Sequence, residues 1–337
     1  MTISPLRRVA AAAPEGLPGV RDLVRAGMGR VFGPPPFDPH ADPGDPGLFG
    51  ADSASARVIG EPAAIVGGIR ALLVQLLHPL AMAGVAEHSR FRADPLGRLH
   101  STSAYVTATA FGSSRQALDV ARRVRRAHRL VRGTAPDGRP YQADDQHLLS
   151  WVSLALTSSF LATDRAYAPE PLDAASADAF VAEQSLAASL LDPRVDIDMI
   201  AGEPAAVGAL RSGTTRLPML VEGRLALTVA DLTARMEAFR SELGLTAQGR
   251  EALRFLAWPP LSPAVRTAYL TMLTGAVVSL QPWQRRLLGL PATRLGAWPL
   301  RAQTRALLAG FRVATGVSPS VAAARRRAGA DPDASAA

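Results

Sequence analysis

The stretch of sequence that decides the fold is EPAAIVGGIRALLVQLLHPLAMAGVAEHS, residues 61–89. Its apolar residues recur at helical spacing up to the His78-Pro79 step, and Pro62 stands in a first helical turn, where proline loses no hydrogen bond. Because proline disfavours helix in the residue before it, the His78-Pro79 step should break or kink the segment. The stretch therefore predicts two consecutive apolar helices, the second reaching about His88.

The helical pattern continues on both sides of this stretch, and strand patterns are nearly absent. Other helices are predicted at about residues 17–31, 95–111, 114–132, 144–162, 172–190, 204–222, 229–242, 248–258, 263–279, 282–289 and 299–314. Residues 136–139 have a tight-turn sequence inside a small predicted hairpin, 133–142. The predicted fold class is therefore all-α, a single multi-helix domain over residues 51–328 with at most that hairpin.

The two ends of the chain differ in composition from the helical region. Residues 33–47, GPPPFDPHADPGDPG, contain prolines that forbid helix. Residues 1–50 are accordingly predicted to be an irregular, extended arm that either wraps the body or moves freely. Residues 329–337 are predicted to be a disordered tail.

Composition excludes several chemistries. The 337 residues are 48% hydrophobic and 20% charged, enough to bury a large core, and they include no Cys, Lys or Asn. Thiolate nucleophiles, Fe–S clusters and Cys-bound zinc are therefore excluded. The absence of Lys also removes a Walker A lysine and Schiff-base catalysis. His, Asp, Glu, Ser, Thr, Tyr and Arg remain for a redox or hydrolytic site.

Charge and hydropathy bear on partners and location. All 37 basic residues are Arg and exceed the 29 acidic residues by a net charge of +8, which by itself suggests nucleic acid or an anionic membrane. Aromatic residues are only 5% and do not alternate with basic runs, and the missing Lys and Asn fit a GC-rich codon bias, so no nucleic acid partner is expected. With no run of about 18 apolar residues and no secretory leader pattern, we expect a cytoplasmic protein without a transmembrane segment.

The histidines are concentrated in the first half of the chain. Apart from His40 in the arm, all of them lie between positions 78 and 147, so a histidine-bound metal or cofactor would draw its ligand from these residues. His-x-x-x-His pairs and a His-Glu-x-x-His motif are absent, which disfavours a zinc site. The Gly-x-Ser-x-Gly motif typical of α/β-hydrolases is also absent, which disfavours a hydrolase. The alternative is that these are ordinary core and surface histidines.

A polar stripe follows one face of the predicted helix 95–111. At 100° per residue, that face carries Arg98, Ser101, Thr102, Tyr105 and Thr109, and His100 points to the opposite side. Polar side chains inside an apolar protein must be hydrogen-bonded. The stripe is expected either to bond internally or to line a cavity that holds a ligand.

The predicted helix 114–132 places one histidine among small apolar residues. Ala117, Ala121, Val124, His128 and Val131 share a face, with Arg125 and Arg132 at its edge. A flat surface with a single imidazole suits an axial haem ligand, and the arginines could pair with the haem propionates. A core histidine on an Arg-rich amphipathic helix is the alternative.

Taken together, the ordered motifs of residues 60–160 resemble the oxygenase family that groups MpaB-type enzymes with the catalytic domain of rubber oxygenases, the latex clearing proteins. The motifs are GIRALLVQLLHP (68–79), GVAEHS (84–89), RLHST (98–102), FG (111–112), VRRAH (124–128), YQAD (141–144) and LLSWV (148–152). The resemblance implies an all-α fold that holds one haem b, with His128 as the proximal iron ligand. It also implies that Arg98 and Thr102 lie on the distal side as catalytic residues.

Two positions depart from the pattern of this family. Ser101 stands where latex clearing proteins have Lys, and Ser153 stands where many relatives have His. The first departure speaks against rubber cleavage and against a Lys ligand to iron, while haem binding is unaffected. His78 matches a motif histidine, for which the Pro79 kink suggests a structural role.

The leading functional hypothesis is a haem b-dependent oxygenase that acts on a hydrophobic small molecule, such as an isoprenoid or another natural product. O2 would bind opposite His128, with polar contacts from Arg98 and Thr102, and Arg125, Arg132, Ala121 and Val124 would contact the cofactor. The alternatives are a haem sensor or carrier without turnover and a cofactor-free helical interaction protein. The sequence leaves the oligomeric state open.

Overall fold

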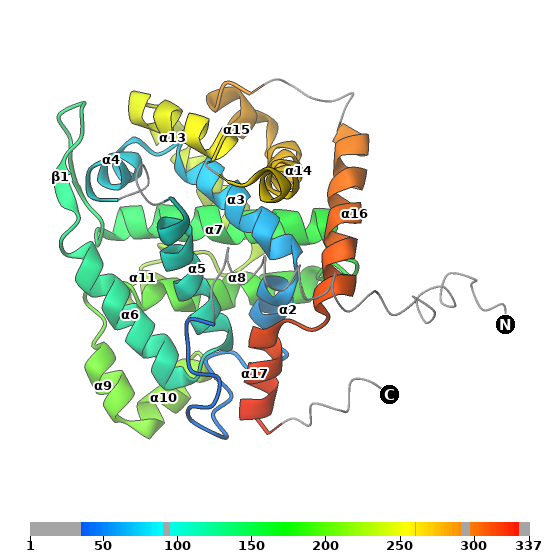
Figure 1. The fold of residues 1–337 in the computed structure, drawn as a ribbon. Coiled ribbons are helices and arrows are strands. Elements are labelled where there is room, and N and C mark those ends of the chain that lie inside the picture. Colours follow the sequence, from blue (N-terminus) through cyan, green and yellow to red (C-terminus); the bar gives the residue numbers. More distant parts are fainter. Residues whose placement is uncertain (1–34, 90–94, 260, 291–296, 330–337) are drawn as a thin grey trace.

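The computed structural model describes residues 35–89, 95–259, 261–290 and 297–329 (Figure 1). In the helix that begins at Pro95, the side chains are described from Ser103 onward. Its helices are α2 (Ala54–Gly60), α3 (Ala63–Gln75), α4 (Pro79–His88), α5 (Pro95–Phe111), α6 (Ser114–His128), α7 (Gln146–Tyr167), α8 (Ala174–Ser189), α9 (Ile197–Gly202), α10 (Pro204–Arg211), α11 (Pro218–Val221), α12 (Val229–Ala238), α13 (Ala247–Ala257), α14 (Pro263–Ser279), α15 (Pro282–Leu287), α16 (Ala297–Thr315) and α17 (Pro319–Arg327). A short 3-10 helix, η2 (Phe239–Glu242), follows α12. The all-α prediction is confirmed; the helix predicted at 17–31 and the tail beyond residue 329 lie outside the described residues.

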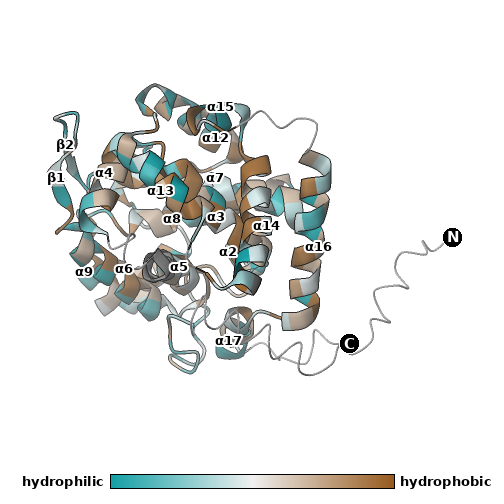
Figure 2. Cartoon of the chain, turned by 45° about the horizontal axis from the view of Figure 1, so that its top comes forward, coloured by the Kyte–Doolittle hydropathy of each residue, from teal (hydrophilic) through white to brown (hydrophobic). Residues whose placement is uncertain are grey.

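The centre of the molecule is the crossing of α3 and α7, around which the other helices are arranged (Figure 1). Figure 2 shows hydrophobic residues concentrated on α3, α7 and α14, and Trp151 of α7 is completely buried. A Cβ atom on Gly67 of α3 would lie 2.6 Å from Phe160 Cδ1 and 2.7 Å from Thr163 Oγ1. The two helices therefore approach closely because position 67 has no side chain.

Local capping fixes where the central helices begin. The predicted break at the His78-Pro79 step is confirmed: α3 ends at Gln75 and α4 begins at Pro79, with the His78 side chain accepting the Ala81 N–H. Asp145 caps α7 by accepting from two backbone N–H groups of its first turn. Both caps join residues within three positions of each other, so they act locally along the chain.

Several predicted boundaries are wrong, each for an identifiable reason. The helix predicted at 114–132 ends at His128, and Arg132 begins a strand instead. The helix predicted at 204–222 is divided into α10 and α11, because Gly213 takes a φ of +70° that an α-helix cannot contain. The short helices α2, α9 and α17 were not predicted.

The predicted hairpin is confirmed in the described residues. Strand β1 (Arg132–Thr134) pairs antiparallel with β2 (Pro140–Gln142), and Gly133 lies opposite Tyr141. Gly138 has a φ of +85° in the connecting turn, a conformation that glycine adopts without strain. The hairpin lies against α4 and orients Tyr141 toward that helix.

The described part of the N-terminal arm, residues 35–50, packs against the body. Asp42 accepts from Ser113 Oγ at 2.5 Å, and the Gly44 N–H donates to the Arg327 carbonyl at 2.7 Å. The buried guanidinium of Arg327 in turn donates to the carbonyls of Asp45 and Phe111. Of the two expected alternatives, these residues take the first: they wrap the body.

Among the described helices, none alone has both the length and the hydropathy of a membrane span. Two bent pairs, α2 with α3 and α16 with α17, satisfy the same requirement only when each pair is taken together.

Candidate functional site

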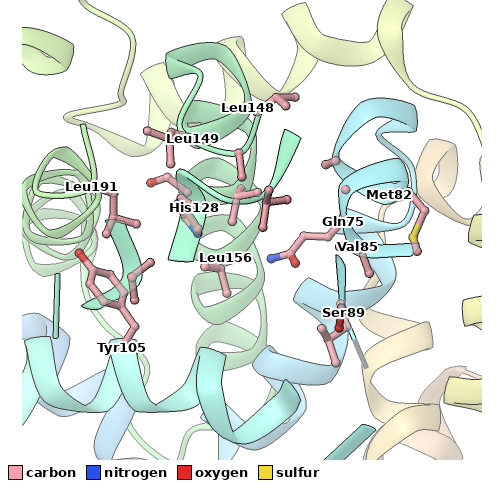
Figure 3. Close-up of a pocket in the computed structure, with 18 of the residues that line it drawn as sticks. Gln75, Met82, Val85, Ser89, Tyr105, His128, Leu148, Leu149, Leu156 and Leu191 are labelled. Atoms are coloured by element: carbon pink, nitrogen blue, oxygen red, sulfur yellow. The ribbon is translucent and has the colours of Figure 1, made fainter. Parts of the chain in front are cut away.

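A cavity of about 790 Å³ lies between α3, α4, α5, α6, α7, α8 and α13 (Figure 3). Much of its wall consists of aliphatic side chains, among them Leu72, Leu76, Leu149, Val152, Leu156 and Leu191. Its volume lies in the range of cofactor and small-molecule sites, roughly 300–1,000 Å³. The cavity is therefore large enough for an apolar ligand of considerable size.

His128, the last residue of α6, lies in the wall of this cavity (Figure 3). Its Nδ1 atom is buried and has no hydrogen-bond partner. Burial lowers the pKa of His128, and the charge of Asp144 opposes that shift. The ring is therefore a neutral imidazole near neutral pH, which is the form that binds a metal.

The small apolar residues predicted around His128 contribute unequally to the cavity. Val124 and Val131 line it, whereas Ala117 and Ala121 are fully buried in a separate cluster with Leu190. The cause is position along the helix: from Ala117 to Val124, α6 advances about 10 Å. Of the face predicted to surround His128, only the part on the last turns of α6 reaches the cavity, and Ala121, which was predicted to contact the cofactor, does not line it.

The two arginines predicted to hold the cofactor do not line the cavity. Arg125 donates from its two terminal nitrogens to the carbonyls of Pro193 and Val195, each at 2.7 Å. Arg132 is exposed on strand β1, outside the helix on which it was predicted. Arg125 thus joins α6 to the segment after α8, a contact between residues about 70 positions apart that helical spacing cannot show.

The predicted polar stripe lies on α5. Arg98, Thr102 and their neighbours Ser101 and His100 belong to this helix, but their side chains lie outside the described part. Further along the helix, Tyr105 lines the cavity and its hydroxyl donates to the Ala187 carbonyl at 2.6 Å. Thr109, the last stripe residue, also lines the cavity. The second half of the stripe thus meets both expectations, because its hydroxyls bond to backbone carbonyls and its residues line a cavity.

Other polar residues of the cavity wall were not singled out from the sequence. The Tyr141 hydroxyl donates to the Glu87 carboxylate, and His88 Nε2 lies 3.1 Å from the same hydroxyl. Burial, together with Glu87, raises the pKa of Tyr141 to about 12. Gln75 extends into the cavity from the end of α3. These residues come from separate elements, so no sequence spacing brings them together.

Outside the cavity, His78, His147 and Glu242 form a compact group whose potential ligand atoms lie within 4.8 Å of one another. His147 Nε2 and a Glu242 oxygen are 2.7 Å apart and pair directly. His78 Nδ1 accepts the Ala81 N–H, which leaves the ring proton on Nε2, where a metal would need the lone pair. The geometry therefore fits a capping histidine beside a His147–Glu242 hydrogen bond rather than a metal centre.

Buried His78 should make stability depend on pH. Burial lowers its pKa to about 4, although Glu242 opposes the shift and His147 and Arg139 reinforce it. The unfolded chain, with an ordinary pKa of about 6.5, therefore binds the proton first as the pH falls. We expect the stability contributed by His78 to be present above its unfolded pKa of about 6.5 and to be lost as the pH falls toward 4, by about 2 kcal/mol at pH 5 relative to pH 8.

Urea unfolding of the wild type and of His78→Asn across this pH range tests the expectation. Asn also caps helix N-termini but does not titrate. As the pH falls, the free energy of unfolding of His78→Asn should decrease less than that of the wild type, by the amount expected for His78. Identical pH profiles for the two proteins would show that His78 does not cause this pH dependence of stability.

Comparison with known proteins agrees with the sequence motifs. The family model described as ER-bound oxygenase mpaB/B'/rubber oxygenase, catalytic domain, matches residues 56–316. No curated protein and no solved structure matches the chain. The matched residues include every helix that lines the cavity. The chain belongs to the mpaB/rubber oxygenase catalytic-domain family, and so to the oxidoreductases.

Proposed function

We propose that this protein is a haem b-dependent oxygenase that uses O2 on a hydrophobic small molecule. The observation that supports it best is the unpartnered, buried Nδ1 of His128 in the wall of the large cavity. A neutral imidazole with an unpartnered ring nitrogen, among apolar side chains, is what an axial haem ligand requires. The family membership supplies the reaction class.

The residues around His128 suit a porphyrin. Val124, Ala127 and Val131 line the cavity together with His128 and offer apolar contacts to a macrocycle bound there. Asp144 Oδ1 is also buried without a partner, and its charge acts on His128. Metal-binding histidines usually donate their second N–H to such a group. When bound, haem would supply the redox chemistry with O2; His128 would hold it and Asp144 would orient His128.

The remaining wall determines which substrate can enter. Aliphatic side chains such as Leu149, Val152 and Leu156 offer no hydrogen bonds, so they favour an apolar chain and exclude water. An isoprenoid or a comparable natural product has this character. Arg98 and Thr102 on α5 remain our candidates for the polar contacts on the oxygen side.

The visible absorption spectrum and the haem content of freshly purified protein test this proposal. We expect a Soret band and about one haem per chain. A substrate-dependent loss of O2 would then separate an oxygenase from a haem sensor or carrier. Protein that contains no haem and takes up none on reconstitution would refute the proposal.

A further inference from the structure

Two buried polar atoms in the described wall of the cavity lack a hydrogen-bond partner. One is His128 Nδ1, and the other is Nε2 of the Gln75 carboxamide. Buried donors without a partner are uncommon in native proteins. Each such atom is therefore a place where a bound molecule can complete the hydrogen bonding.

Other polar side chains of the same wall are already paired inside the protein. Gln184 Nε2 donates to Ser55 Oγ at 2.9 Å, Tyr105 donates to the Ala187 carbonyl, and Tyr141 donates to Glu87. Gln184 is the useful comparison, because it is a second glutamine lining the cavity. Of these two amides, only that of Gln75 has an unused buried donor.

The position of Gln75 is fixed by the end of α3. It is the last residue of that helix, and its carbonyl accepts the His78 N–H at 3.3 Å. Its side chain extends into the cavity from the wall that faces His128 (Figure 3). Leu72, Leu76 and Leu156 line the same cavity, and a hydrogen bond made in such apolar surroundings is stronger than in water.

We propose that Gln75 is a ligand-binding residue whose Nε2–H donates a hydrogen bond to an oxygen atom of the molecule lying between it and His128. The inference rests on the proposed function for the identity of the cavity's occupants. It specifies a ligand that is apolar over most of its surface and offers one acceptor oxygen at this point. That oxygen belongs either to a diatomic molecule at the cofactor or to the organic substrate.

Gln75→Met tests the inference, because methionine keeps the length of the side chain and removes the amide. The matched control is Gln184→Met. In the first arm, infrared spectra are recorded on the carbon monoxide complex of the reduced, haem-containing protein. If Nε2 donates to the diatomic ligand, the C–O stretching frequency rises in Gln75→Met, since a nearby N–H donor weakens the C–O bond, and stays unchanged in Gln184→Met.

In the second arm, binding of 1-octanol and of octane to the purified protein is compared. If Nε2 donates to an organic oxygen, Gln75→Met weakens 1-octanol binding roughly three- to tenfold, the range of one neutral hydrogen bond, and leaves octane binding within about twofold. Gln184→Met should leave the preference between the two ligands unchanged. Thermal unfolding verifies that each variant is folded, and Gln75→Leu replaces Gln75→Met if the latter does not fold.

A change in either arm supports the inference and identifies the source of the oxygen. Unchanged infrared and binding results in both arms overturn it. Wild-type protein that binds no haem would refute the proposed function instead, and the octanol arm would still decide the role of Gln75.

Discussion

On the proposed function, His128→Ala should give a folded protein that no longer binds haem. Alanine removes the imidazole from the cavity wall but leaves the apolar surface, and no other described histidine except His88 lines that cavity. Loss of an outer-shell partner alone lowers metal affinity by about 10- to 100-fold, so loss of the ligand itself should exceed about 100-fold. The haem-to-protein absorbance ratio of the purified variant measures the effect.

Two further variants separate ligand loss from damage to the fold. His88→Ala removes the other cavity histidine, whose Nε2 contacts the Arg132 carbonyl and Tyr141, and should keep its haem. His128→Gly supplemented with imidazole should regain haem, because the free base can occupy the vacated position. If His128→Ala keeps full haem while His78→Ala or His88→Ala loses it, the ligand is not His128.

Gly67→Ala should destabilise the protein by about 3 kcal/mol, the upper end of the usual overpacking range. The new Cβ would lie 2.6 Å from Phe160 Cδ1, 2.7 Å from Thr163 Oγ1 and 3.2 Å from the backbone Cα of Phe160. Thr163 cannot turn aside freely, because its hydroxyl donates to the carbonyls of Ser159 and Phe160 inside the core. The two central helices must therefore move apart. Urea unfolding monitored by circular dichroism measures the loss.

The neighbouring glycine provides the matched control. A Cβ on Gly68 meets no atom within 4 Å, although it is in the same helix one residue later. Gly68→Ala should leave the free energy of unfolding unchanged or raise it by up to about 1 kcal/mol, because alanine favours helix more than glycine does. Equal effects of the two substitutions would show that the approach of α3 to α7 does not depend on position 67.

Prediction from the sequence succeeded where the structure depends on residues close together in the chain. The break at the His78-Pro79 step and the turn at Gly138 depend on chemistry within a few residues, and the structure contains both. The prediction of helix ends failed where the backbone conformation of a single residue ends the helix, as at Gly213. The spacing of small residues made His128 a candidate and left a core histidine as the alternative, and the family resemblance implied its role as ligand. The structure places His128 in the wall of a large cavity.

The sequence by itself therefore determined the all-α class and the central helices, because periodicity, proline and capping act locally along the chain, and it named His128 only as a candidate ligand. Only the tertiary structure decided what surrounds that histidine. In the folded protein, Arg125 donates hydrogen bonds to carbonyls about 70 residues away, and Ala121 is buried in a separate cluster. Gln75 of α3 lies in the cavity wall that faces His128. Such contacts join helices distant in sequence, and their partners are fixed by how whole apolar faces pack rather than by any local spacing.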